Sequence, residues 1–591
     1  MIKQLILYAI WVSPMGNDHN AGSKESPLRT VAAAFRMVRE ERRLAAVKEP
    51  IHIILRGGEY LLEETLFVRP EDAGGPGSPT VVEAAPGEEP VVSGGVRVSG
   101  WRRMKGNIYE ADVPFLGGRP LGFRQLWVNG VKAVRSRDIS DEDHMNRILA
   151  VDKGREEMVI PATVEIKDAK NLEMVIHQMW ATAVLRVRSV ERVGNTYHLR
   201  FWEPEGQLEF EHPWPAAVID SGHKQNGNSA YYLTNALKLL DSPGEWYEDI
   251  EKGKIYYWPR AGEDLASANV VVPALTQLVR VAGIIDRPVS YVQFKGIRFA
   301  YSTWMRPSEA GHVPLQAGMY LLDAYKLKIP GTPDKKGLEN QAWIGRPPGA
   351  VEVSFADHML FQGCRFGHMA STGVDFLRGT HADTVRDCVF TDVGGTAIQA
   401  GVYSDEAFET HLPYDPSDDR ELCRDEWIEN NLVTDCTNED WGCVGISAGY
   451  VRDFHIEHNE VREVSYSGIC VGWGWTRTVN SLRNNHIVGN YVHHYGKHMY
   501  DVGGIYTLSA QPGTIITENR IDSIYHPAYV HDPQHWFYFY FDEGSSYITI
   551  RNNWCPGEKF MRNANGPGNV WENNGPMVDE KIKLSAGIKK Q

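Results

Sequence analysis

The chain has 591 residues, 42% of them apolar, and a formal net charge of −15 at pH 7. A chain of this length can bury a large core in one or two domains. Its negative charge argues against nucleic acid or an anionic membrane surface as a partner. No stretch reaches the roughly 18 consecutive apolar residues that a membrane span requires.

The first hundred residues predict the N-terminal end of a β-solenoid. Residues 1–10 carry a lysine and a short apolar run, which suits either a signal-peptide remnant without a clear cleavage site or an ordinary first strand. A Pro27-initiated helix follows, from Thr30 to about Leu44. Residues 51–55 and 80–84 are the first predicted strands. We therefore assign residues 11–100 to a short N-terminal capping helix and the first coils of a solenoid.

The composition changes near Trp101. From there to residue 272 apolar and polar residues alternate, and Asn129-Gly130 is a strong signal for a hairpin turn. This pattern predicts an inserted, antiparallel, β-sandwich-like domain over residues 101–272. The alternative is an irregular decoration of the solenoid.

A repeat dominates residues 273–580. The pattern apolar-x-x-(Asn, Cys or Ile)-x-apolar recurs mostly every 20 to 34 residues, the range of β-solenoid coils. Its central positions are Ile297, Cys364, Cys388, Asn431, Asn459, Asn490, Asn519, Asn553 and Asn573. Asparagines at one turn of successive coils can stack as a ladder of amides. The pattern predicts an all-β chain built on a parallel β-helix. Two longer intervals, around residues 329–349 and 415–426, are predicted to project from it.

The seven cysteines form an odd number without a C-x-x-C pair, which favours neither a disulfide framework nor a zinc site. Cys364 and Cys388 are expected to stack in the core as thiols. His494-x-x-x-His498 lies in a predicted loop without an obvious third ligand, so no metal site is predicted there. We expect no cofactor, and a structural calcium ion is left open.

Acidic and aromatic residues gather between residues 439 and 543. Parallel strands of successive coils lie about 4.8 Å apart, so an exposed sheet forms a long groove that suits a glycan. Residues expected to bind the substrate in this groove are Glu439, Asp440, Trp473, Trp475, His494, His498, Tyr500, Tyr506, His531, His535 and Glu543. For the pairs Trp473 and Trp475, His494 and His498, and Glu439 and Asp440, plain packing or turn capping is the competing interpretation.

Two aspartates are the candidate catalytic residues. Asp501 precedes the predicted strand 504–508, and Asp542 follows the aromatic run 537–541 on the next coil. Glycosidic bonds are cleaved by a pair of carboxyl groups, one of which needs a raised pKa to act as an acid. The aromatic run favours Asp542 as that acid. The alternative is that each aspartate caps a turn.

These segments resemble glycoside hydrolase family 141. The resemblance rests on YDVGGIYTL (500–508), YFDEGSS (540–546), LWVNG (126–130), PGEWY (243–247) and YWP (257–259). It implies a right-handed parallel β-helix with an inserted β-sandwich. It also implies α-L-fucosidase activity on a complex pectic glycan or, in another branch, xylanase activity. The two catalytic aspartates proposed for the family correspond to Asp501 and Asp542.

The leading hypothesis is a glycoside hydrolase that acts on a plant cell-wall oligo- or polysaccharide. A polysaccharide lyase and a non-catalytic glycan-binding β-helix are the alternatives. Asn-Thr-Asp, Gly-His-Gly and Arg-Ile-Lys triplets are absent, which argues against a family 28 polygalacturonase. The substrate class suggests a secreted or periplasmic protein, with cytoplasmic action on imported oligosaccharide as the alternative. The sequence determines neither the oligomeric state nor the stereochemical outcome.

Overall fold

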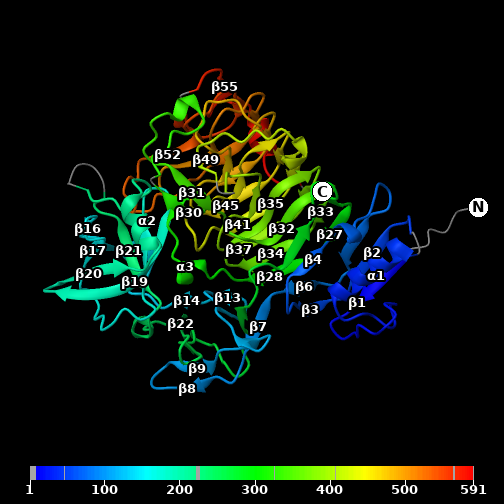
Figure 1. Ribbon diagram of the computed structural model, residues 1–591, viewed down its shortest axis with the longest axis horizontal. Coiled ribbons are helices and arrows are strands. Elements are labelled where there is room, and N and C mark those ends of the chain that lie inside the picture. Colours follow the sequence, from blue (N-terminus) through cyan, green and yellow to red (C-terminus); the bar gives the residue numbers. More distant parts are fainter. Residues whose placement is uncertain are drawn as a thin grey trace, which may run out of the picture.

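A computed structural model describes residues 8–44, 47–220, 226–324, 326–405, 408–563 and 566–589. Three long sheets, with 12, 13 and 9 described strands, contain only parallel pairings and form the body of the molecule. Figure 1 shows their coils in sequence order, from the N-terminal strands in blue to β55 in red. The chain is an all-β parallel β-helix, as the repeat predicted.

One coil shows how the solenoid is built. β44 (His455–Glu457), β45 (Glu460–Val464) and β46 (Ile469–Val471) follow one another along the chain. They belong to the 12-, 9- and 13-stranded sheets respectively, so each coil turns three corners. Apolar residues of equivalent positions stack inside, as when the rings of Phe366 and Phe390 lie 4.6 Å apart. The long hydrophobic repeat therefore becomes one continuous core.

The corner between the 12- and 9-stranded sheets carries the predicted asparagine ladder. The side-chain amide of Asn431 donates to Asn459 at 3.0 Å, and the series continues through Asn490, Asn519 and Asn553. The prediction was wrong about the last rung. Asn553 donates to Asn574 at 2.8 Å, whereas Asn573 is exposed and bonds Asn552. β55 (Val570–Asn574) pairs in the register that places Asn574 beside Asn553, one residue later than the pattern suggested.

The first coil is covered by α1 (Val31–Leu44), which confirms the predicted capping helix. Val31, Ala34, Phe35 and Val38 form its buried face. β1 (Tyr8–Val12) and β2 (Ile51–Leu55) pair in parallel beneath it. Residues 1–7, which bear on the signal-peptide interpretation, lie outside the described part of the chain.

The antiparallel insertion leaves the solenoid at one corner. It runs between β7 (Gly95–Val98) and β24 (Val270–Pro273). These two strands pair with each other in antiparallel fashion where the chain leaves and rejoins the solenoid. This corner follows β6 (Pro90–Ser93) of the 9-stranded sheet and precedes β25 (Val279–Ala282) of the 13-stranded sheet. The inserted strands, mostly cyan, lie beside the solenoid (Figure 1). The strands β7 and β24 lie near the predicted limits of the insertion, at residues 101 and 272.

Two sheets, with seven and five described strands, form most of the insertion. The larger contains β18 (Glu173–His177), β19 (Thr182–Val193), β20 (Thr196–Phe201) and β21 (Ala230–Thr234). The smaller contains β22 (Glu245–Asp249) and β23 (Lys254–Tyr257). The predicted Asn129-Gly130 turn joins β12 (Trp127–Val128) to β13 (Val131–Lys132), and both turn residues have positive φ, at 51° and 76°.

The seven cysteines are buried free thiols, including Cys364 and Cys388 in the core. Among the described residues, no helix is long and apolar enough to cross a membrane.

Candidate active site

Two neighbouring strands of the 13-stranded sheet position the candidate aspartates. β49 (Val502–Thr507) pairs with β52 (Trp536–Phe541), and Tyr506 lies opposite Tyr540. Asp501 immediately precedes β49 with a φ of 60°, a left-handed conformation that turns the chain at the corner. Asp542 immediately follows β52. The two carboxyl groups therefore approach the same sheet from opposite ends.

Both aspartates line one cleft of about 280 Å³. The other lining residues come from the solenoid, from the long loop after β28 (Arg298–Ser302) and from the inserted sheets. They are Trp180, Trp214, Leu315, Gln316, Lys335, Leu338, Asn340, His411, Trp475, Tyr506, Tyr540 and Glu543. The aspartates are thus brought together across the sheet, as the coil register predicted.

The surroundings of Asp542 favour its neutral form. Burial among the aromatic residues raises its pKa, against the effect of a hydrogen bond from the Tyr506 hydroxyl, and the negative charge of Asp501 raises it further, to about 6. The Asn563 amide also donates to the carboxyl, at 3.2 Å. A carboxyl with this pKa holds a proton in about half of the molecules at pH 6 and in about one in ten at pH 7.

The Asp501 carboxyl group has different neighbours from that of Asp542. Tyr540 donates its hydroxyl proton to Oδ1 at 2.7 Å, and His535 Nε2 lies 2.8 Å from the same oxygen. The bond to Asp501 raises the pKa of His535. A protonated His535 places a positive charge beside Asp501. Both contacts use Oδ1 and neither uses Oδ2.

The two tyrosines connect the aspartates. Their rings lie 4.4 Å apart, Tyr506 bonds Asp542, and Tyr540 bonds Asp501. Gln316 donates to the Tyr506 hydroxyl at 3.1 Å, which directs that hydroxyl's own proton to Asp542. Each tyrosine thus fixes the carboxyl group of a different coil.

An ion pair lies at the edge of the cleft. Lys335 Nζ is 2.8 Å from Glu543, the residue after Asp542. The loop that carries Lys335 is anchored by Asp334, which accepts hydrogen bonds from Thr476 at 3.0 Å and from the backbone N–H of Arg477 at 2.6 Å. Lys335 is 8% exposed, so its charge is held in place rather than free in solvent.

Three tryptophans contribute aromatic surface. Trp475 follows the solenoid strand β46 and packs near His411, with 5.1 Å between the ring centroids. Trp180 lies at the tip of the β18–β19 hairpin, where its indole N–H donates to the Leu315 carbonyl at 2.7 Å. Trp214 is 40% exposed. Rings placed in this way suit the apolar face of a sugar.

The structure corrects the expectation that Trp473 and the pair Glu439-Asp440 reach the substrate. Trp473 is 1% exposed and donates its indole N–H to Thr410, so no ring face is available for stacking. Glu439 is held by Lys132 and Gln125 of the insertion. Asp440 is paired with His312 at 3.2 Å. Glu439 thus links the solenoid to the insertion, Asp440 links it to the loop after β28, and Trp473 is part of the solenoid core.

Four other expected binding residues also point elsewhere. His494 bonds His493, and His498 stacks on Trp441 with 4.3 Å between centroids. Tyr500 is 8% exposed in a small cluster that packs against the insertion, and His531 bonds the Gly227 carbonyl. His498, Tyr500 and His531 lie where the insertion meets the solenoid, and Nε2 of His177 from the insertion is 2.8 Å from the His498 carbonyl. His494 instead contacts other residues of the solenoid. His535 contacts Asp501, and Tyr506, Trp475 and Glu543 line the cleft.

Sequence reasoning missed the residues that lie far from the repeat. Trp180 and Trp214 belong to the insertion, and Lys335 and Asn340 belong to the predicted projecting loop. The only available signal for these residues was the position in the coil from which their segments leave the solenoid. The insertion, this loop and the segment before Asp501 all leave the solenoid between a strand of the 9-stranded sheet and one of the 13-stranded sheet. Among the described residues, no group of three or more His, Cys, Asp or Glu side chains could hold a metal ion.

Comparisons with known proteins agree with this architecture. A family model described as "GH141 insertion domain" matches residues 106–260. A solved structure named "Glycoside hydrolase" is 52% identical, with 98% of this chain and 99% of that chain covered and a TM-score of 0.95. A structure of XylC with xylose covers 94% of this chain and 69% of that chain at 14% identity and a TM-score of 0.50, which is a likeness of fold. No curated protein matches the chain.

A glycoside hydrolase that is 52% identical over nearly the whole length belongs to the same family as this chain. The matched insertion domain identifies that family as 141. The chain is a glycoside hydrolase of family 141.

Proposed function

We propose that this glycoside hydrolase releases α-L-fucose from a pectic oligosaccharide, with Asp542 as the general acid and Asp501 as its partner. The observation that carries the proposal is the cleft in which two carboxyl groups from adjacent coils have unlike surroundings. A pair of carboxyl groups in unlike environments is what glycosidic cleavage needs. The fucosyl specificity rests on the family resemblance of the motifs around the two aspartates.

The mechanism follows from the proton on Asp542. The carboxylic acid gives this proton to the glycosidic oxygen while the bond from that oxygen to the anomeric carbon breaks. The Asp501 carboxylate then either attacks the anomeric carbon or takes a proton from a water molecule that attacks it. In the first route, the carboxylate of Asp542 later activates the water that releases the sugar from Asp501. Tyr540 and His535 both contact Oδ1 of Asp501, so we assign Oδ2 as the oxygen that reacts with the sugar or the water.

A screen of substrates tests the proposal. The purified protein is incubated with 4-nitrophenyl α-L-fucoside, fucosylated pectic oligosaccharides and xylo-oligosaccharides, and released sugars are identified by chromatography. We expect fucose from the first two substrates. Release of xylose-containing products alone would assign the chain to the xylanase branch, the activity closest to the ligand of the XylC structure. Products with ultraviolet absorbance from a new double bond would indicate a lyase.

A further inference from the structure

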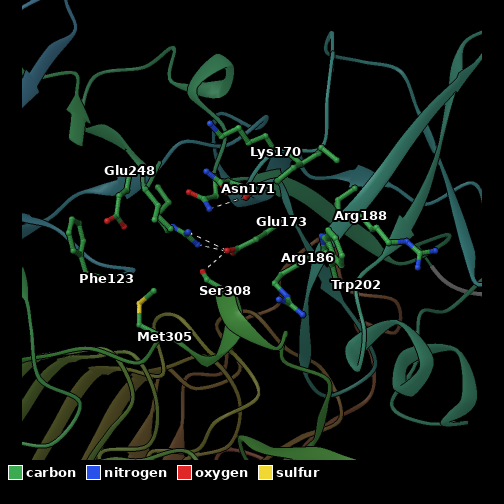
Figure 2. A pocket seen from close by; sticks show the side chains of 16 residues that line it. Phe123, Lys170, Asn171, Glu173, Arg186, Arg188, Trp202, Glu248, Met305 and Ser308 are labelled. Atoms are coloured by element: carbon green, nitrogen blue, oxygen red, sulfur yellow. Dashed lines mark hydrogen bonds and ion pairs between the residues drawn. The ribbon is translucent and has the colours of Figure 1, made fainter. Parts of the chain in front are cut away.

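A second cavity lies in the insertion, away from the catalytic cleft. It has a volume of about 430 Å³ and is bounded by β18 and β19, by β22, and by α3 (Arg306–Glu309) of the solenoid loop. Figure 2 shows Glu173 at its centre, with Phe123 and Glu248 on one side and Trp202 with Arg186 and Arg188 on the other. It shares no lining residue with the cleft that holds Asp501 and Asp542.

The floor of this cavity is a rigid ion network. The Glu173 carboxylate is 2.9 Å from Arg124 and 2.8 Å from Arg135, and it accepts a hydrogen bond from Ser308 at 2.5 Å. Glu173 is 2% exposed. Ser308 belongs to the solenoid, so the network fixes the insertion to the β-helix at this point. A cavity over a buried, hydrogen-bonded ion network keeps its shape without a ligand.

Three side chains around the cavity have binding capacity that the fold does not use. Trp202 directly follows β20 and is 50% exposed, although indole rings are usually covered in folded proteins. Glu248 is 5% exposed, and its carboxyl accepts a hydrogen bond from the backbone N–H of Phe123. Burial raises the pKa of Glu248 to about 8, so its carboxyl is protonated at neutral pH and can donate. Arg188 is exposed and has no ion-pair partner within the described part of the chain.

We propose that this cavity is a second carbohydrate-binding site, which takes a sugar residue of the polysaccharide. An aromatic ring with hydrogen-bonding side chains around it matches a sugar, which has an apolar face and hydroxyl groups at its edge. Trp202 supplies the ring, the Glu248 carboxyl donates to a hydroxyl, and Asn171 and Arg188 supply further polar contacts. Phe123 and Met305 add apolar surface opposite Trp202.

The site is separate from the reaction. β19 runs from the hairpin tip that carries Trp180 to Arg186 and Arg188, a span of roughly 20 Å at about 3.3 Å per residue. A sugar in the cavity therefore does not contact the two aspartates. Its binding holds a long glycan on the enzyme and raises the local concentration of bonds that can be cleaved. The rate of cleavage of a small aryl glycoside is not raised by this binding.

A microarray of plant cell-wall polysaccharides tests the site without catalysis. The D501N/D542N double variant is compared with the same protein carrying Trp202→Ala, Glu248→Gln or, as the control, Trp427→Ala. Trp427 is an exposed ring, 37% accessible, on the outer wall of the solenoid. We expect W202A to lose about tenfold in binding to one or more polysaccharides, since stacking on one ring is worth about 1.4 kcal/mol. E248Q should lose less, and W427A nothing.

An array on which every signal is the same with and without Trp202 would overturn the proposal. In the wild-type background, W202A should leave kcat/KM on an aryl glycoside unchanged and lower the rate on the polysaccharide found by the array. Equal losses on both substrates would also contradict a separate site. Because the array measures binding alone, a wild type that hydrolyses none of the screened substrates would end the proposed function without affecting this inference.

Discussion

The solenoid and the insertion contribute different things to one cleft. The coils supply Asp501 and Asp542, whose spacing is set by the pairing of β49 with β52. The insertion supplies Trp180 and Trp214, which come from a hairpin tip and a loop. The periodic part of the molecule fixes the reactive groups, and the irregular part encloses them. Catalysis and substrate recognition should therefore be separable by mutation.

The largest effect is expected at the solenoid carboxyls. Asp501→Asn should lower kcat by about a hundred- to ten-thousandfold, because the amide can neither attack the sugar nor accept a proton from water. The control is Glu439→Gln, in the same sequence region but bonded to Lys132 outside the cleft. It should keep kcat within about threefold. Steady-state kinetics, with circular dichroism to verify folding, measures both; a control that loses as much as D501N would remove the distinction.

Substitutions in the asparagine ladder should lower the stability of the fold and leave the catalytic rate unchanged. Asn490→Ala removes the amide that donates to the Ile456 carbonyl and accepts from Asn459. Leaving these buried groups unpaired should cost about 3 kcal/mol of unfolding free energy. Asn573→Ala, at the exposed position that the sequence pattern assigned to the ladder, should cost under about 0.5 kcal/mol. Denaturant unfolding distinguishes the two, and equal losses would contradict the ladder as described.

A smaller effect is expected for the insertion. Trp214→Ala should raise KM about tenfold while kcat changes little, since a stacked ring contributes about 1.4 kcal/mol of binding in ground and transition states alike. Trp202→Ala, in the cavity of the insertion around Glu173, is the matched control on an aryl glycoside. A drop in kcat with unchanged KM for W214A would show that the insertion takes part in the chemical step.

The smallest expected effect is a shift in pH dependence. Asp542 must be protonated to act, so the rate should fall as the pH rises through its pKa of about 6. The negative charge of Glu543 raises this pKa and the Tyr506 hydroxyl lowers it. Glu543→Gln should therefore move the alkaline limb of kcat/KM to lower pH, and Tyr506→Phe should move it to higher pH, each by less than about one unit. Shifts in the same direction would exclude Asp542 as the titrating acid.

The contrast between solenoid and insertion also explains how much the sequence could predict. The asparagine repeat indicated the coils, and the coils placed Asp501 and Asp542 on neighbouring strands. Trp473 and Trp475 looked alike in sequence, but Trp473 turns into the core beside Tyr403, whereas Trp475, with a φ of 48°, reaches the cleft. Trp180 and Lys335 could not be found, because the distance between a loop and a remote coil depends on the length and direction of the insertion.

The central claim is that two carboxyl groups act on one glycosidic bond in different roles. The most direct test measures kcat/KM of D501N and D542N on aryl glycosides whose leaving groups differ in acidity. A good leaving group needs no proton, so D542N should lose little on a dinitrophenyl glycoside and much on an alkyl glycoside, whereas D501N should lose heavily on both. Equal losses for the two variants across the series, or turnover retained by either on every substrate, would contradict the account.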